Sequence, residues 1–133
     1  MWETFEADAV LDQATPVQNT WYTVCNLADC IINAIIFKVA TTGETLEVET
    51  TRDGVVVNGS IAAAANTYYA AGKDPTGTTS LTIYSMSTPA TAQTYDIIAL
   101  KSFKCKSFQM RLRKTTAAGT GNLYGKVSYG EVG

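Results

Sequence analysis

One apolar stretch constrains the fold more than any other part of the chain. Residues 31–40 read IINAIIFKVA, and an extended strand would place apolar side chains on both of its faces, because successive side chains point to opposite sides. Such a strand is typical of a position that is covered on two sides. Residues 46–53 begin instead with an alternation of apolar and acidic side chains, namely Leu46, Glu47, Val48 and Glu49. With a turn at Gly43, the two segments predict a β-hairpin over residues 31–53.

The rest of the chain reads as further short strands between turns. At 133 residues with 46% hydrophobic residues, the chain can close one core in a single domain. Residues 26–29 are predicted as a tight connection and residues 66–79 as a surface loop. Residues 60–65 (SIAAAA) leave a strand and a single helical turn equally open. Additional strands are predicted at residues 19–25, 55–57, 81–86, 95–101, 108–113 and 123–129.

This spacing predicts an all-β protein, a single-domain β-sandwich or jelly roll of about eight or nine antiparallel strands. The domain is expected over residues 18–133. Residues 1–17 lack a sustained strand or helix period and are predicted as an N-terminal arm, whose large apolar groups Trp2 and Phe5 need a surface to bury against. The surface of the arm's own domain and the surface of a neighbouring molecule are both open alternatives.

The charges are unevenly distributed, although the net charge is only −2. Residues 1–53 hold nine acids and two bases, whereas residues 54–133 hold eight bases and three acids. Alternation places two arginines on the wet face of the strand at residues 108–113. We expect them to meet two acids across a sheet, within one copy or between two. The four residues are Glu47, Glu49, Arg111 and Arg113.

A basic run extends from Lys101 to Lys114 with no acid inside it. A surface for nucleic acid is one reading of such a run. However, the residues interleaved with these bases are mostly inward strand positions, and the protein as a whole is slightly acidic. A solvated sheet face, or a docking site for an acidic partner, is therefore favoured, and no nucleic-acid partner is predicted.

The sequence contains no histidine, which removes Ser-His-Asp and Cys-His catalysis, imidazole zinc sites and histidine proton shuttles. Glu47 and Glu49 share a wet strand face and do not provide two carboxylates opposed across a cleft. The motifs GxGxxG, GxxxxGKS/T and CxxC are absent. We therefore predict a protein that is not an enzyme and that uses no cofactor and no metal.

Three cysteines carry the remaining chemistry. Cys25 and Cys30 flank a predicted turn, so their sulfurs could form a disulfide across its mouth. Two half-buried thiols are the alternative, which a reducing cytoplasm favours. Cys105 lies between Lys104 and Lys106, whose charges would stabilise a thiolate and make it the most reactive thiol if it is exposed. A buried Cys105 would be inert.

No membrane association is expected. No apolar run approaches the ~20 residues that cross a bilayer. The first residues also carry acids where a signal peptide needs positive charge. We therefore expect the chain to fold and assemble in a cytoplasm.

Two parts of the sequence resemble a known group of proteins. Residues 18–24 (QNTWYTV) lead through the apolar strand to residues 40–48 (ATTGETLEV), and residues 108–121 lead to the final strand. These segments resemble segments of small β-sandwich virion proteins of tailed bacteriophages. Proteins of this group are capsid decoration or cement proteins, head fibres and appendage modules. The resemblance implies a jelly-roll-like homotrimer that binds the major capsid protein or another virion protein and performs no chemistry. Three cysteines depart from that pattern.

The leading hypothesis is a structural virion protein, assembled in the host cytoplasm, that decorates and stabilises a bacteriophage capsid. Its predicted contacts are Trp2 and Phe5 in the arm, Ile32 and Ile36 at a subunit contact, and the Glu–Arg pairs.

The alternative is an appendage or tail-tip module that binds a host-surface glycan through Tyr68, Tyr69 and the loop at residues 66–79. Aromatic side chains could stack on sugar rings, although they more often belong to cores and interfaces. Other aromatic residues of this kind are Trp21, Tyr22 and Tyr84.

Overall fold

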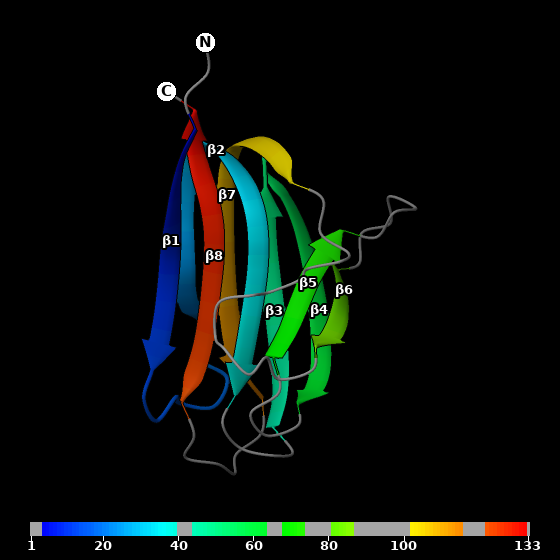
Figure 1. The fold of residues 1–133 in the computed structure, drawn as a ribbon. Coiled ribbons are helices and arrows are strands. Elements are labelled where there is room, and N and C mark those ends of the chain that lie inside the picture. The colour runs from blue at the N-terminus through cyan, green and yellow to red at the C-terminus, as the bar shows by residue number, and fades with distance from the viewer. Residues whose placement is uncertain are drawn as a thin grey trace.

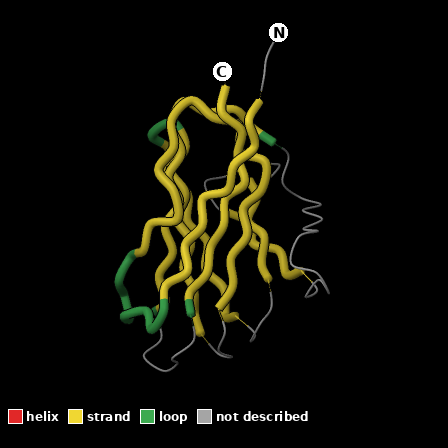
Figure 2. Tube along the Cα trace, turned by 60° about the vertical axis from the view of Figure 1, so that its left-hand side comes forward, coloured by secondary structure: helices red, strands yellow, loops and turns green. Residues whose placement is uncertain are grey.

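The computed structural model of the protein describes residues 4–39, 44–63, 68–73, 81–86, 102–115 and 122–132. None of these residues is helical, and the strands that fill Figure 2 confirm the predicted all-β class. The described strands are β1 (Thr4–Gln13), β2 (Tyr22–Val39), β3 (Glu44–Arg52), β4 (Val55–Ala63), β5 (Tyr68–Lys73), β6 (Leu81–Met86), β7 (Phe103–Lys114) and β8 (Leu123–Val132).

These strands form one antiparallel sheet. Six of them follow each other in the order β1-β8-β2-β7-β3-β4, while β5 pairs with β2 and with β6. β1 and β8 pair along their whole length, so the first and the last described strands lie side by side. Figure 1 accordingly shows the start of β1 and the end of β8 at the same end of the protein.

The predicted β-hairpin over residues 31–53 is wrong. Its two arms belong to β2 and β3, but β7 lies between these strands and pairs with both. Opposite charges favour the pairing of β3 with β7, because β7 places arginines directly across from Glu47 and Glu49. The corresponding arm of β2 is almost wholly apolar. The turn expected at Gly43 lies outside the described residues.

The predicted connection at residues 26–29 is also wrong, since β2 continues through it. The register of β2 shifts near Val24 and near Asn33, and Asp29 has a positive φ of 48°. Aspartate tolerates this conformation better than most residues, and register shifts of this kind bend a strand. β2 can therefore pair with β7 over residues 22–32 and with β8 over residues 30–39.

The core contains inward-facing side chains of β2, β3, β7 and β8. Its largest fully buried members include Phe37, Phe108, Ile32, Ile35, Leu46, Met110, Leu112 and Leu123. The expectation that residues 31–40 are covered on both faces is confirmed for Ile32, Ile35, Ile36 and Phe37, which are at most 2% exposed. The prediction that Ile32 and Ile36 form a subunit contact is wrong, because the single chain already buries them and leaves no surface for another subunit.

Much of the predicted N-terminal arm is part of the sheet, because residues 4–13 form β1. Ala9 and Leu11 pack against the core, so this segment packs on its own domain, which was one of the two alternatives. Trp2 lies outside the described residues, and only the backbone of Phe5 is described.

The remaining predicted segments have different outcomes. β5 lies within the predicted surface loop, so that prediction is wrong for residues 68–73. β4 extends to Ala63 and resolves the open assignment there as a strand. The strand predicted at residues 81–86 is confirmed as β6, whereas residues 95–101 lie outside the described residues.

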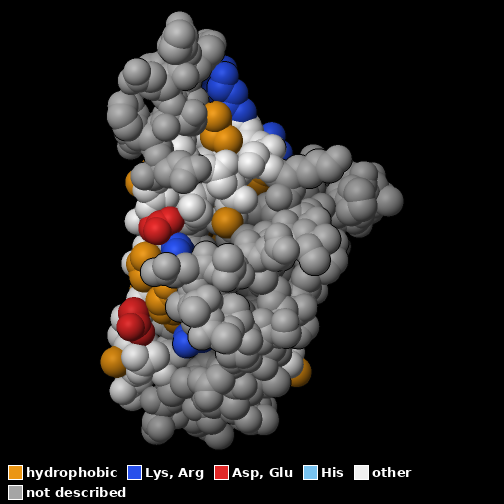
Figure 3. All heavy atoms as spheres, viewed as in Figure 1, with side chains coloured by type: hydrophobic (Ala, Val, Ile, Leu, Met, Phe, Trp, Pro, Cys, Tyr) orange, Lys and Arg blue, Asp and Glu red, His pale blue; other side chains and the backbone are white. Residues whose placement is uncertain are grey.

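Two strands form the ends of the six-strand order. Among the described strands, β1 pairs only with β8 and β4 pairs only with β3. Exposed valines occur on both end strands, with exposures of 54% for Val10 in β1 and of 60% and 49% for Val55 and Val56 in β4. Figure 3 shows apolar and charged side chains interspersed along the margin where Figure 1 draws β1.

Candidate functional site

A connected group of polar and aromatic side chains occupies the outer face of β7, β3 and β4. These strands alternate in period 2, so residues on one face point to the core and their neighbours point outward. The antiparallel register then aligns outward residues into two rows across the three strands. The rows are Arg113–Glu47–Ser60 and Arg111–Glu49–Asn58.

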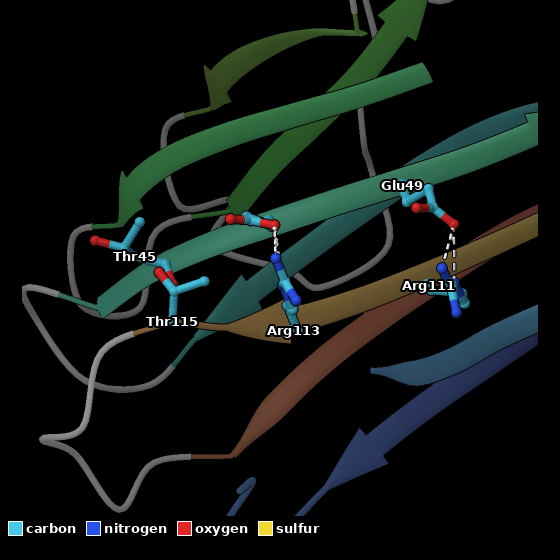
Figure 4. Close-up of polar contacts among 6 residues, drawn as sticks. Thr45, Glu49, Arg111, Arg113 and Thr115 are labelled. Atoms are coloured by element: carbon cyan, nitrogen blue, oxygen red, sulfur yellow. Dashed lines mark hydrogen bonds and ion pairs between the residues drawn. The ribbon is translucent and has the colours of Figure 1, made fainter. Parts of the chain in front are cut away.

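Both arginines form ion pairs within the chain, as Figure 4 shows. Arg111 Nη2 lies 2.5 Å from Glu49 Oε1, and Arg111 Nε donates to the same oxygen at 2.9 Å. Arg113 Nη2 lies 2.7 Å from Glu47 Oε2, and its Nε donates to that oxygen at 2.9 Å. The structure therefore brings the four predicted residues together within one copy. Their role at an interface stays a prediction.

Trp21, immediately before β2, lies against both arginines. The Cζ atoms of Arg111 and Arg113 are each 4.6 Å from the centroid of its ring. An arginine at this distance from an indole makes a favourable cation–π interaction. The carboxylates and the indole thus restrain each guanidinium group from two directions.

An open groove of about 420 Å³ adjoins this group, lined by Trp21, Arg113, Glu47, Glu49 and residues 58–60 of β4. Its lining offers guanidinium donors, carboxylate acceptors, an amide and a hydroxyl. The Nε and Nη2 atoms of each arginine contact the same oxygen of its partner, Glu49 Oε1 or Glu47 Oε2. The second carboxylate oxygens accept no hydrogen bond from the described residues. Such a lining suits a ligand that is rich in hydroxyl groups.

Sequence reasoning missed the contribution of β4 to this groove. Asn58-Gly59 reads as a turn between strands, because this dipeptide is common in hairpin turns. In the structure both residues lie inside β4. The signal that could have found them is the alternation of polar Asn58 and Ser60 with Val57 and Ile61.

The possible disulfide between Cys25 and Cys30 is not formed, and the alternative of two free thiols holds. Both residues lie on one continuous strand, and both thiols are free and buried. Because β2 does not turn between them, nothing folds one sulfur back onto the other. Cys30 instead lies opposite Cys105 of β7, with 3.5 Å between the two Sγ atoms.

The expected reactivity of Cys105 is also contradicted. Its side chain is only 6% exposed, and burial is the main cause that raises its pKa to about 12. The flanking Lys104 and Lys106 are exposed, because alternation turns them away from the buried thiol. Burial likewise raises the pKa of Cys25 to about 11 and raises the pKa of Cys30. The alternative of a buried Cys105 therefore holds.

The remaining predicted ligand residues are placed only in part. Tyr68 and Tyr69 begin β5, and only their backbone is described. In the described part of the chain, no group of three or more Cys, Asp and Glu side chains could hold a metal ion. No helix among the same residues has the length and apolar character to cross a bilayer. Comparisons with protein-family models, with curated proteins and with solved structures returned no match.

Proposed function

We propose that this protein is a structural virion protein that decorates and stabilises a bacteriophage capsid through contacts between subunits and with the shell. The observation that carries the proposal is the exposure of Val10 in β1 and of Val55 and Val56 in β4, the strands at the two ends of the sheet order. End strands offer unpaired backbone groups to other chains, and apolar side chains on them are stabilised when another molecule covers them. The resemblance of two sequence segments to virion proteins supports the same function.

The body of the protein is proposed to be a β-sandwich or jelly roll. A Cβ atom added at Gly125 of β8 would lie 2.7 Å from Leu112 Cδ1 of β7. These strands are separated by β2 in the sheet order, which in a flat sheet would keep their backbones about 10 Å apart. The close approach of Leu112 therefore supports a sheet that bends over a shared core.

We further propose a homotrimer. If the β1 edge of one copy meets the β4 edge of the next, the contact joins two different surfaces, and repetition about a threefold axis closes a ring. The Glu–Arg pairs are already formed within each copy, and Ile32 and Ile36 are buried there. The exposed valines of the two end strands are therefore the apolar side chains that we propose for assembly.

The first experiment measures the mass of the protein by light scattering at micromolar concentration. We expect the mass of three chains, and we expect Val10→Asp and Val55→Asp each to give monomers because a charge would be buried at the contact. Asn26→Asp is the matched control, since Asn26 is exposed on β2 in the middle of the order. A stable wild-type monomer, or trimers in both valine variants, would contradict the proposed assembly.

The location on a virion needs a separate test. Antibodies against the protein, applied to purified phage particles whose genome encodes it, are expected to label the head surface in electron micrographs. Label confined to the tail would favour an appendage, and particles that lack the protein would contradict a virion role.

The groove beside Trp21 favours a second candidate function, the binding of a host-surface glycan. This site differs from the one expected at Tyr68 and Tyr69, because it is formed by the outer face of β3, β4 and β7. On a glycan array, the protein would bind a defined glycan, and Asn58→Ala combined with Ser60→Ala would remove that binding. Asn26→Ala is the control variant. An array without binding would leave decoration as the better function.

A further inference from the structure

Cys30 and Cys105 form a thiol pair that neither the proposed assembly nor the groove uses. They lie directly opposite each other in the β2–β7 ladder, and their Sγ atoms are 3.5 Å apart. Their exposures are 0% and 6%. Cys105 Sγ also lies 3.7 Å from the carbonyl oxygen of Cys30. Both sulfurs therefore share one small buried space between two neighbouring strands.

The backbone geometry at this pair is compatible with a disulfide. Residues that face each other in an antiparallel pair have Cα atoms about 4.5 or about 5.5 Å apart, and both separations fall within the roughly 4.4–6.8 Å that disulfides span. Bond formation would bring the sulfurs from 3.5 Å to about 2.05 Å. Rotation of the two side chains can supply this change without moving either strand.

We propose that Cys30 and Cys105 are a latent disulfide site, which closes when the protein meets a peroxide outside a reducing compartment. One sulfur, having lost its proton, attacks a peroxide oxygen; the O–O bond breaks, and a sulfenic acid and one water result. The second sulfur attacks the sulfenic sulfur, the S–O bond breaks, the S–S bond forms and a second water leaves. The thiols lose two protons and two electrons in total, and one hydrogen peroxide is reduced to two waters.

Burial makes this reaction slow. The thiolate is the attacking species, and burial raises the pKa of both Cys30 and Cys105. A brief exposure to peroxide therefore leaves the pair reduced, whereas hours of exposure allow local opening of the ladder to admit the oxidant. Cys25 is buried in the same strand but faces Met110 and not a thiol, so it serves as an internal control.

Closure would join β2 to β7 covalently. The two cysteines are 75 positions apart in the chain, and a bond across so long a segment restricts the unfolded chain strongly. We expect the oxidised protein to unfold at a temperature higher by about 5 °C or more. A reductant should reverse this shift.

The test uses the full chain, purified with a reductant and then held in hydrogen peroxide for hours. After removal of the peroxide, iodoacetamide is added to the unfolded protein, and the intact mass gives the number of free thiols. We expect one of the three cysteines to be alkylated in the wild type. We expect none to be alkylated in Cys25→Ser, and two in Cys30→Ser.

Peptide mapping identifies the bonded cysteines. No Lys or Arg precedes Lys38, so trypsin leaves Cys25 and Cys30 in a single peptide, while Cys105 is released with Lys106 as a dipeptide. In Cys25→Ser, a link between these two peptides identifies Cys30. Fragmentation of the linked wild-type peptide between residues 25 and 30 gives the same assignment without a variant. Three free thiols after prolonged oxidation, a link through Cys25, or irreversible oxidation of Cys105 would each overturn the proposal.

Discussion

The two faces of the β3–β7 ladder share one backbone but differ in chemistry. On the inner face, five apolar side chains are at most 2% exposed: Leu46, Val48, Phe108, Met110 and Leu112. On the outer face, the side chains of the two ion pairs keep 17–33% of their exposure. One hydrogen-bonded register holds both faces in place.

This difference separates the residues that stabilise the ladder from those that specify it. Burial of one large apolar side chain contributes about 1.5–3 kcal/mol, whereas a partly exposed ion pair contributes about 0–1 kcal/mol. A register slip of one residue would turn the charges inward. A slip of two residues keeps the faces correct but leaves one arginine and one glutamate without a partner. The inner face therefore provides stability, and the outer face selects the register.

The largest effect is expected at Leu112, on the inner face. Leu112 is 0% exposed and belongs to the main core cluster, so Leu112→Ala should lower the free energy of unfolding by about 2–5 kcal/mol. Urea denaturation would measure this loss. The control is Leu112→Met, which keeps most of the volume and should cost less than about 1.5 kcal/mol. Equal costs for the two variants would contradict the packing described for the inner face.

A smaller loss is expected at Gly125, which faces Leu112 from β8. A Cβ atom there would lie 2.7 Å from Leu112 Cδ1 and 2.8 Å from Val24 Cγ2, so Gly125→Ala should cost about 1–3 kcal/mol through overpacking. Leu112→Ala removes one of the two clashing atoms. The double variant should therefore lose less stability than the sum of the single losses. Strict additivity in urea denaturation would show that β7 and β8 do not meet at this point.

On the outer face, an ion pair is expected to contribute less to the free energy of unfolding than a buried side chain of the inner face. A double-mutant cycle with Glu49→Gln and Arg111→Gln should give a coupling of about 0.5–1 kcal/mol. This coupling should decrease in high salt because the pair is partly exposed. The cycle is needed because Arg111 also contacts Trp21, and a single variant would lose both interactions. A coupling as large as the Leu112→Ala loss would remove the distinction between the two faces.

The same comparison explains what the sequence could predict. Alternation assigned Phe108, Met110 and Leu112 to the inside and Arg111 and Arg113 to the outside, and the burial of the three apolar residues confirms that assignment. It succeeded because the direction of a side chain depends only on its own strand. The choice of neighbour is not local, and the hairpin over residues 31–53 is wrong for that reason.

Turn-forming residues were a misleading local signal at two places. Residues 26–29 and the Asn58-Gly59 dipeptide carry turn-forming residues, but both lie inside strands, where Asp29 adopts its positive φ without ending β2. The pairing of Cys30 with Cys105 depends on the register of segments 75 positions apart. Periodicity within one strand contains no information on that register.

The smallest effect is expected where the ladder ends, at Asp53. Asp53 Oδ1 accepts hydrogen bonds from the backbone N–H groups of Lys106 at 2.8 Å and Ser107 at 3.0 Å. These bonds are the main cause that lowers the pKa of Asp53 below its ordinary value of 3.8. The ionised carboxylate is therefore favoured in the folded state. Its contribution to stability is present above the ordinary pKa and is lost as the pH falls through the lower folded value.

Asp53→Asn tests this assignment, because asparagine keeps an acceptor oxygen and tolerates the positive φ of 49° at this position but does not titrate. Near neutral pH the variant should be slightly less stable than the wild type, because it lacks the contribution of the ionised carboxylate. Between about pH 4 and about pH 2 its stability should fall less steeply, and urea midpoints measured across this range would show the difference. If the urea midpoints of wild type and variant fell equally with pH, the carboxylate would not anchor the β3–β4 turn to β7. A change as large as that of Leu112→Ala would place a main source of stability outside the core, against the division of roles between the two faces.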